Sequence, residues 1–362
     1  MITLLKNIEC YAPEYIGKKD LFIACRKICK ITSPGGLANQ EPIADVINCE
    51  GLIAFPGLID QHVHIIGGGG EEGFASRIPE IRFEEIAAAG VTTLCGLLGA
   101  DGCTRTLETL YAKAKALELN GITTYLYAGS YEIPAVTFTG SIMRDLILID
   151  KVIGAGEIAI SDHRSSQPDT GELLKLAAQV HLGGLLAGKA GVLHLHVGDG
   201  KEGLAPVLKM EDHSDLPKEM FVPTHVNRNP RLFRQAMDYC KSGGNIDLTA
   251  GESNGIPVPK AIRMLAEQNP DLSTVTVSSD ANGSIPQGGT VKIQVLYKDL
   301  RDCILEEGLK PETVIRLATV NVAKILHLYP QKGVIREGSD ADLLITDHDY
   351  RIRMVFAMGK RL

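Results

Sequence analysis

The middle of this 362-residue chain alternates between short apolar segments typical of strands and longer segments with the spacing of amphipathic helices. Residues 91–95 and 123–127 are strand candidates, and apolar side chains recur at helical spacing between them. Thr104 is expected to cap this helix and Gly121 to end it. Further strand candidates lie at 192–197, 220–225, 245–249 and 275–279. Repeated strand–helix units predict a parallel sheet, which is either open and doubly wound or closed into a barrel.

Polar side chains follow several of these strand candidates at the point where each one ends. They are His62 and His64 after residues 55–59, His196 within 192–196, His225 after 221–224, and Asp280 after 275–279. In a barrel the carboxyl ends of all strands converge on one mouth, so side chains from distant parts of the sequence meet there. This placement favours the closed barrel over the open sheet.

The pair His62 and His64 is the strongest local pattern among these residues. Residues i and i+2 of a strand point the same way, so both imidazoles can reach one cation. Imidazole and carboxylate are ligands that zinc and similar metals favour. The alternative is a pair of surface histidines near a loop. His194 and His196 also share one face, and either of them could be a ligand while the other is a neighbour. The other histidines are expected to be structural or solvated.

Composition excludes several classes of partner and location. The formal net charge is −7 and no run of Lys or Arg occurs, so a nucleic-acid partner is not expected. No apolar stretch approaches the roughly 20 residues of a membrane helix, so no membrane association is expected. The N-terminus lacks the features of a secretory signal. Eight scattered cysteines without a Cys-x-x-Cys pair are typical of reduced thiols, and the expected location is the cytoplasm.

Two motifs at opposite ends of the chain resemble a known family. Residues 56–64 (PGLIDQHVH) and 337–343 (EGSDADL) are similar to the opening and closing signatures of the amidohydrolase superfamily. Within it, the chain resembles the bacterial isoaspartyl (β-aspartyl) dipeptidases. That likeness lies in residues 60–71, 160–165, 223–229 and 278–284.

The resemblance implies an α/β fold with two parts. Residues 55–331 would form a (β/α)₈ TIM barrel, and residues 1–54 and 332–362 would pair into one small β-sandwich. Strand candidates at 21–25, 27–31, 342–346 and 353–357 agree with a sandwich built from both chain ends. The resemblance also implies a large homo-oligomer, such as an octamer.

The same resemblance implies a pair of zinc ions in the barrel mouth, although other divalent metals are compatible. His62, His64 and Asp280 would hold the more buried ion, and His196 and His225 the outer one. A carbamylated lysine on the fourth strand normally bridges such a pair.

This chain departs from the family pattern at that strand, because residues 152–160 contain no lysine. The segment offers Glu157 instead and is one residue longer than the usual pattern. A glutamate side chain is shorter than a carbamylated lysine, so the strand would have to bulge toward the metals to let Glu157 bridge them. The alternative is that Glu157 is solvated and the site holds one metal.

On the substrate side the resemblance assigns binding roles to charged and flexible residues. Glu71 would pair with the ammonium of an isoaspartyl dipeptide, and Arg164 and Arg228 would bind carboxylate. Ser284 would add a hydrogen bond. Gly69, within a run of four glycines, would let backbone approach the ligand.

The resemblance also implies how the reaction proceeds. A hydroxide bridging the two metals would attack the side-chain amide, Tyr131 would stabilise the oxyanion, and Asp280 would carry the proton to the leaving amine. Ala100 stands where the family often has threonine, which removes one hydrogen bond to the substrate.

Other functions remain open on the sequence alone. A cyclic amidase or an N-acyl amino acid deacetylase would use a similar metal site. A non-catalytic scaffold is the third alternative, and it is disfavoured by the intact set of histidines with Asp280.

Overall fold

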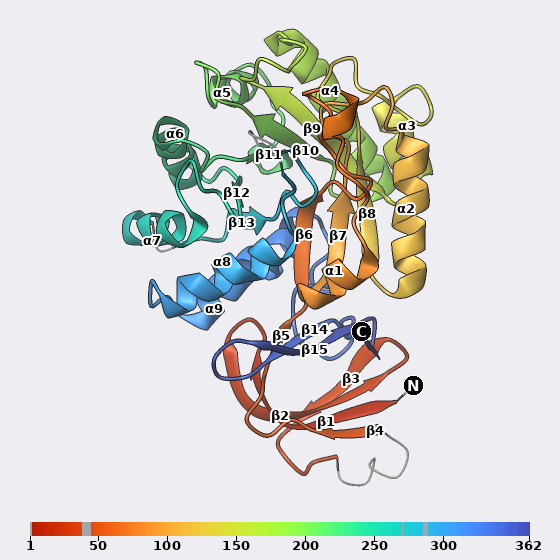
Figure 1. Cartoon of the computed structure of the whole chain (residues 1–362), viewed down its shortest axis with the longest axis vertical. Coiled ribbons are helices and arrows are strands. Elements are labelled where there is room, and N and C mark those ends of the chain that lie inside the picture. Colours follow the sequence, from red (N-terminus) through yellow and green to blue (C-terminus); the bar gives the residue numbers. More distant parts are fainter. Residues whose placement is uncertain (1, 38–44, 270, 285–288) are drawn as a thin grey trace.

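The computed structural model describes residues 2–37, 45–269, 271–284 and 289–362, and it contains a parallel barrel and a separate sheet built from both chain ends (Figure 1). The order of strands in the terminal sheet is β16-β15-β14-β5-β1-β2-β3, and β4 pairs with β1. Its strands are β1 (Thr3–Tyr11), β2 (Tyr15–Ala24), β3 (Lys27–Thr32), β4 (Asp45–Asn48), β5 (Ile53–Pro56), β14 (Leu343–Thr346), β15 (Ile352–Ala357) and β16 (Lys360–Arg361).

The two chain ends meet where β5 pairs with β14 in antiparallel register, with Phe55 opposite Leu344. Apolar side chains on one face of this sheet, such as Ile8, Leu21 and Phe356, form a core of their own. Phe55 and Leu344 instead belong to the same apolar cluster as the barrel. The sheet is therefore packed on the barrel as well as on itself. The domain limits of 1–54, 55–331 and 332–362 stay a prediction.

Among the described residues, eight parallel strands line the barrel. The first six form one sheet in chain order, and the last two pair with each other. They are β6 (Leu58–Val63), β7 (Val91–Gly96), β8 (Thr123–Ala128), β9 (Val152–Ile160), β10 (Val192–Val197), β11 (Phe221–Thr224), β12 (Ile246–Thr249) and β13 (Val275–Ser278). The strands predicted from sequence at 91–95, 123–127, 192–197, 220–225, 245–249 and 275–279 are confirmed to within a residue or two.

Two backbone contacts complete the ring. The amide of Val226 donates to Asp247 O at 3.4 Å and links β11 to β12. The amide of His64 donates to Ala281 O at 2.9 Å and links the end of β6 to the chain just beyond β13. The fold is therefore the predicted TIM barrel, and the open doubly wound alternative is excluded.

Helices surround the barrel and follow the strands in alternation (Figure 1). They are α1 (Phe83–Ala88), α2 (Leu107–Asn120), α3 (Ile142–Leu148), α4 (Thr170–Ala187), α5 (Ala205–Asp212), α6 (Pro230–Lys241), α7 (Val258–Gln268), α8 (Gln294–Leu305), α9 (Pro311–Ile315) and α10 (Val320–Ile325). Across the described ranges, none of these helices combines the length and apolarity needed to cross a membrane.

The start of α2 corrects one prediction from the sequence. Thr106, and not Thr104, is the N-cap, and its hydroxyl accepts from the amide of Thr109 at 3.3 Å. Thr104 is engaged elsewhere, because its hydroxyl donates to Asp101 and accepts from Arg77. The predicted end is confirmed, since Gly121 takes the left-handed conformation at φ 114°.

Candidate metal centre

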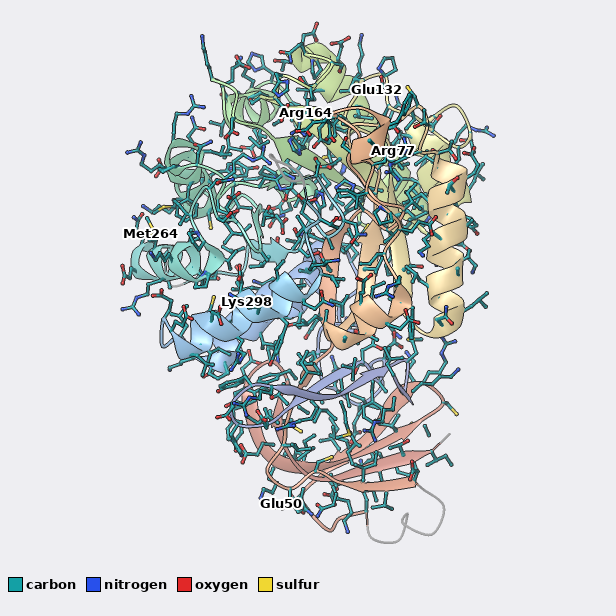
Figure 2. The ribbon with its side chains drawn as sticks, in the orientation of Figure 1. Glu50, Arg77, Glu132, Arg164, Met264 and Lys298 are labelled. Atoms are coloured by element: carbon teal, nitrogen blue, oxygen red, sulfur yellow. The ribbon has the colours of Figure 1, made fainter. Side chains whose placement is uncertain are left out.

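The ends of four barrel strands bring a cluster of buried histidines and carboxylates together. His62 lies in β6 and His64 just beyond it, His196 lies near the end of β10, and His225 directly follows β11. Asp280 lies two residues after β13. Figure 2 shows that this barrel mouth, marked by Arg164, lies at the far end of the molecule from Glu50 of the terminal sheet.

Glu157 of β9 lies between two pairs of histidines. Its Oε1 is 3.6 Å from His62 Nε2 and 3.4 Å from His64 Nε2. Its Oε2 is 3.0 Å from His196 Nδ1 and 3.4 Å from His225 Nε2. The side chain is 1% exposed, so the solvated alternative for Glu157 does not describe this structure.

An irregularity in β9 accounts for this placement. Leu193 of β10 pairs with Ala155, but Leu195 pairs with Ile158, so β9 has one more residue than its neighbour between these points. The extra residue is a β-bulge, which re-aims side chains locally. The bulge expected from the length of this segment is therefore present at the position of Glu157.

Asp280 completes the cluster on the side of the first two histidines. Its Oδ1 is 3.4 Å from His62 Nε2 and 3.1 Å from His64 Nε2. Two groups have ligand atoms close enough to share an ion, namely His62 with His64 and Asp280, and His62 with Glu157 and His225.

Burial and charge set the protonation of this cluster. Burial by itself raises the pKa of the Glu157 carboxyl, but the neighbouring His62 and His196 outweigh it and hold that pKa well below its usual range. Burial lowers the pKa of His225 to about 3, so this imidazole is neutral at pH 7. A neutral imidazole and an ionised carboxylate are the forms that bind divalent metals.

The donor set fits a metal centre. His62 Nε2 points into the cluster, is buried, and has no hydrogen-bond partner among the described residues. A buried nitrogen without a partner is costly, and a cation at this place would satisfy it. Imidazole nitrogens with two carboxylates are a ligand set that suits zinc and related ions.

Contacts behind the cluster orient two of the histidines. His194 Nε2 lies 2.9 Å from His62 Nδ1, on the side away from the carboxylates, and His194 stacks on Tyr127. The hydroxyl of Thr249 lies 2.7 Å from His225 Nδ1. Of the two histidines in β10, it is thus His196 that faces Glu157, while His194 contacts another imidazole. Partners of this kind fix the tautomer and direction of a ligating ring.

Three of the predicted substrate-binding residues lie together at the rim. Arg164 Nη1 is 3.3 Å from Glu71 Oε1, and the hydroxyl of Ser284 donates to the same oxygen at 2.8 Å. Gly69 lies two residues before Glu71, in the loop between β6 and α1. Arg228 follows β11, and its Nε is buried without a partner among the described residues.

The two remaining predicted residues lie on neighbouring loops. The Tyr131 hydroxyl lies 2.9 Å from His196 Nδ1, and burial raises the pKa of this phenol well above its usual range. Ala100 is exposed in the loop after β7, next to Gly99, whose carbonyl accepts from the amide of Tyr131 at 3.2 Å. The Ala100 methyl group can offer no hydrogen bond.

Asp162 is a residue of the site that the sequence analysis did not single out. Its Oδ2 is 3.0 Å from His196 Nε2 and 2.8 Å from Arg164 Nη2, and its Oδ1 accepts from Arg164 Nε at 3.0 Å. Arg228 Nη1 lies 4.0 Å from the same carboxylate. Asp162 lies in the motif of residues 160–165, so its position within that motif was the available signal.

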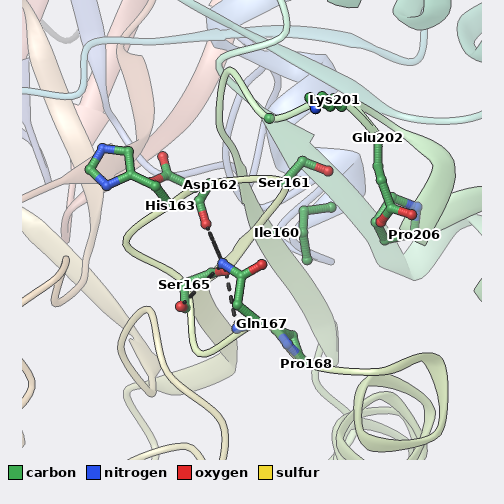
Figure 3. A pocket seen from close by; sticks show the side chains of 11 residues that line it. Ile160, Ser161, Asp162, His163, Ser165, Gln167, Pro168, Lys201, Glu202 and Pro206 are labelled. Atoms are coloured by element: carbon green, nitrogen blue, oxygen red, sulfur yellow. Dashed lines mark hydrogen bonds between the residues drawn. The ribbon is translucent and has the colours of Figure 1, made fainter.

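A cavity of about 410 Å³ adjoins Asp162 on the loops after β9 and β10 (Figure 3). His163, Ser165 and Gln167 line one side of it, and Lys201 and Glu202 line the other. Gln167 Nε2 donates to the carbonyl of Asp162 at 2.8 Å, which ties this loop to itself. The loop that carries Asp162 and Arg164 is therefore held in a defined shape.

Comparisons with known proteins agree with this geometry. The model of the Amidohydrolase family matches residues 53–362. The crystal structure of β-aspartyl dipeptidase from the thermophilic, keratin-degrading Fervidobacterium islandicum AW-1 is similar at 43% identity and a TM-score of 0.94, covering 100% of this chain and 97% of that one.

A second crystal structure of the Fervidobacterium enzyme, in complex with the β-Asp-Leu dipeptide, has the same identity and TM-score, and 96% of that chain is covered. The L-hydantoinase of Paenarthrobacter aurescens is a more distant relative, 23% identical over 96% of this chain and 86% of its own. Together, the family match over the barrel and its closing strands and the full-length similarity to a solved relative show that the chain belongs to the amidohydrolase family, among the β-aspartyl dipeptidases.

Proposed function

We propose that this protein hydrolyses isoaspartyl (β-aspartyl) dipeptides, releasing aspartate and the second amino acid. The observation that carries this proposal is the group of Glu71, Arg164 and Ser284 at the rim of a metal-type cluster. An isoaspartyl dipeptide carries one ammonium and two carboxylates, so a rim with both signs of charge complements it. The similarity to a β-aspartyl dipeptidase whose structure contains β-Asp-Leu supports the same substrate class.

The charged residues of the rim are arranged to exchange partners with such a substrate. Glu71 and Arg164 face each other at 3.3 Å. A zwitterionic ligand would give Glu71 an ammonium and Arg164 a carboxylate, so neither charge is left unpaired. Arg228, whose buried Nε has no partner among the described residues, would bind the other carboxylate.

We propose two zinc ions as the cofactor, and other divalent metals are compatible with the same ligands. His62, His64 and Asp280 would hold one ion, His196 and His225 the other, and Glu157 would contribute one oxygen to each. This assignment is supported by the two carboxylate oxygens of Glu157, since Oε1 lies near His62 and His64 and Oε2 near His196 and His225. When bound, such ions lower the pKa of water and polarise a carbonyl group.

The chain's own residues supply the remaining chemistry. A water molecule adds to the side-chain amide carbon, and Asp280 accepts its proton and returns it to the leaving nitrogen as the C–N bond breaks. Tyr131 is protonated at neutral pH, so its hydroxyl donates a hydrogen bond to the oxygen that becomes negative. Asp162 holds the guanidinium of Arg164 in place for the substrate carboxylate.

A hydrolysis panel tests this proposal. Purified protein is incubated with β-Asp-Leu, α-Asp-Leu, a hydantoin, an N-acyl amino acid and an N-acetyl sugar, and its metal content is measured in parallel. We expect cleavage of β-Asp-Leu in preference to all the others. Preferred opening of the hydantoin would assign a cyclic amidase, and metal-free protein without activity on any of them would assign a scaffold.

We also propose that the protein works in the cytoplasm as a homo-oligomer such as an octamer. All eight cysteines are unpaired, and three of them are exposed, which supports a reducing location. Leu182, Leu185 and Leu186 of α4 and Ile147 and Leu148 of α3 are exposed, and these two helices pack against each other. Exposed apolar side chains on neighbouring helices support contact between subunits. Light scattering at several concentrations measures the number of subunits.

A further inference from the structure

Arg105 is a buried arginine whose partners are backbone carbonyl groups. The residue is 8% exposed, and in the described part of the chain its guanidinium donates to backbone carbonyls rather than to a carboxylate. Its Nη2 donates to Gly68 O at 2.7 Å and to Ile78 O at 3.0 Å, and its Nη1 donates to Ile66 O. A buried charge normally pairs with an opposite charge, so this arrangement needs an explanation.

The position of Arg105 next to α2 does not explain its burial. It directly precedes Thr106, the N-cap of α2. The N-terminus of a helix carries a partial positive charge, so a cation is disfavoured there. Burial and the nearby Arg77 lower the pKa of Arg105, and they outweigh Asp101, Glu71 and Glu80, which raise it. Its contribution therefore lies in the loop whose carbonyls it binds.

That loop connects β6 to α1 and folds back tightly on itself. The amide of Ile78 donates to Gly68 O at 3.0 Å, and Gly69 and Arg77 form an isolated bridge. A Cβ atom at Gly67, where φ is +76°, would lie 2.0 Å from Ile78 O, so the two backbone segments touch. Such close backbone leaves carbonyls buried, and Arg105 provides their donors.

The far side of the loop is attached to the segment that carries Asp280. The amide of Gly68 donates to Asn282 O at 2.8 Å, and Asn282 Nδ2 donates to Pro79 O at 2.9 Å. The loop is thus held between Arg105 on one side and Asn282 on the other. Glu71 lies in this loop, three residues after Gly68, and its carboxylate contacts Arg164 and Ser284.

We propose that Arg105 is a positioning residue for substrate binding, whose guanidinium fixes the loop of residues 66–79 through three carbonyl groups and so sets the place of Glu71. The inference rests on the proposed function, in which Glu71 binds the substrate ammonium. Arg105 touches no reacting atom, and it acts through the backbone of the glycine loop.

The kinetic test compares two substrates that differ only in the ammonium. β-Asp-Leu carries it, and succinyl-leucine is the same molecule without it. We expect Arg105→Ala to lower kcat/KM for β-Asp-Leu by about 10–100-fold, mainly through KM, because a small displacement of a binding group has effects of this size. The loss for succinyl-leucine is expected to be much smaller. Equal losses for both substrates would overturn the proposal in favour of a general structural role.

The structural test is independent of the substrate. Hydrogen exchange of the amides of Gly68 and Ile78 is expected to speed up in Arg105→Ala, while exchange in the barrel strands stays as in the wild type. Unchanged exchange in this loop would contradict the proposal even if the protein hydrolyses β-Asp-Leu. Wild-type protein that does not hydrolyse β-Asp-Leu would contradict the proposed function and leave the exchange result to decide the role of Arg105.

Two further variants guard against simple misfolding. Arg105→Lys keeps the charge but replaces the planar fork by one ammonium, and we expect an intermediate loss of selectivity. Arg144→Met removes an exposed arginine on α3 and is expected to behave as the wild type. A cavity of about 370 Å³ adjoins Arg105, so added guanidinium ion can enter and is expected to restore part of the selectivity of Arg105→Ala. Lack of recovery together with an unfolded Arg105→Lys would count against a positioning role.

Discussion

At the scale of single residues, the proposed metal pair depends most on the charge of the Glu157 carboxylate. Two divalent ions roughly 3.5–4 Å apart repel each other strongly unless an anion lies between them. Histidines are neutral as ligands, and Asp280 lies within 3.4 Å of His62 and His64. In the part of the chain that the structure describes, Glu157 contacts both histidine pairs.

Glu157→Gln keeps the shape of the side chain and removes this charge. We expect its metal content to fall from two ions per subunit to one or none and most of the activity to be lost. Activity of the wild type should not depend on bicarbonate, because no lysine carbamate has to form. Elemental analysis and kinetics measure both, with Glu108→Gln on the surface of α2 as the matched control. Two retained ions with full activity would contradict the bridging role.

The substrate charges are tested by removing their partners. We expect Arg228→Ala and Glu71→Ala each to lower kcat/KM for β-Asp-Leu by at least ~100-fold, because each leaves a charged group of the substrate unpaired at a cost of about 2–5 kcal/mol. Glu72→Ala changes the adjacent exposed glutamate and should have little effect. Kinetics near those of the wild type in both variants would exclude the dipeptide while leaving hydrolysis of another amide open.

At the scale of elements, the register of a strand or the start of a helix depends on contacts with neighbouring segments. The bulge in β9 turns Glu157 into the barrel, and the pairing of β10 with β9 locates it. The N-cap of α2 is Thr106 and not the predicted Thr104, because the hydroxyl of Thr104 is hydrogen-bonded to Asp101 and Arg77. Residue preferences at the N-cap identify several candidates in a sequence, and the cap is the candidate whose side chain is not bonded elsewhere.

The cap of α2 can be tested by a pair of substitutions. Thr106→Ala is expected to lower the free energy of unfolding by about 0.5–2 kcal/mol, since it removes the acceptor for the amide of Thr109. Thr104→Ala should leave the helix capped and cost less. Urea denaturation followed by circular dichroism compares the two, and an equal or larger loss in Thr104→Ala would argue for the cap that the sequence suggested.

At the scale of the whole molecule, a buried ion cluster joins the terminal sheet to the barrel. Lys332 Nζ lies 2.9 Å from Asp340 Oδ2 and 2.6 Å from Asp342 Oδ2, and it donates to the hydroxyl of Thr123 in β8 at 2.9 Å. The Lys332 side chain is 3% exposed. These aspartates belong to the closing motif of residues 337–343, so the motif serves to attach the chain end to the barrel.

Lys332→Met is expected to lower the free energy of unfolding by about 3–5 kcal/mol, because it removes the cation that the buried Asp340 and Asp342 share, although Lys27 still pairs with Asp340 at 2.8 Å. Burial raises the pKa of Asp340, but Lys332 and Lys27 outweigh burial and lower it overall. A carboxyl group whose pKa is lower in the folded state stabilises the fold at pH values above its ordinary pKa of 3.8. This contribution is lost as the pH falls through the pKa of the folded state. Denaturation at several pH values should show this acid loss in the wild type and less of it in Lys332→Met. A variant as stable as the wild type would exclude the attachment role.

The amino-acid sequence was enough to predict a barrel and the residue types at its mouth. Local periodicity defines strands and helices, and residues at strand ends converge wherever parallel strands close into a ring. His62, His64 and Asp280 could therefore be predicted as site residues, because each follows an apolar strand candidate. The likeness of residues 56–64 and 337–343 to family signatures predicted that the two chain ends form one sheet, and β5 does pair with β14.

Which of these side chains contact one another follows from the folded structure alone. His196 rather than His194 faces Glu157, Asp162 joins a histidine to two arginines, and Arg105 binds the glycine loop. Each of these depends on distances between segments far apart in the chain, which no local pattern encodes. A shift of one residue in β9 would turn Glu157 away from the histidines, because successive side chains of a strand point to opposite faces.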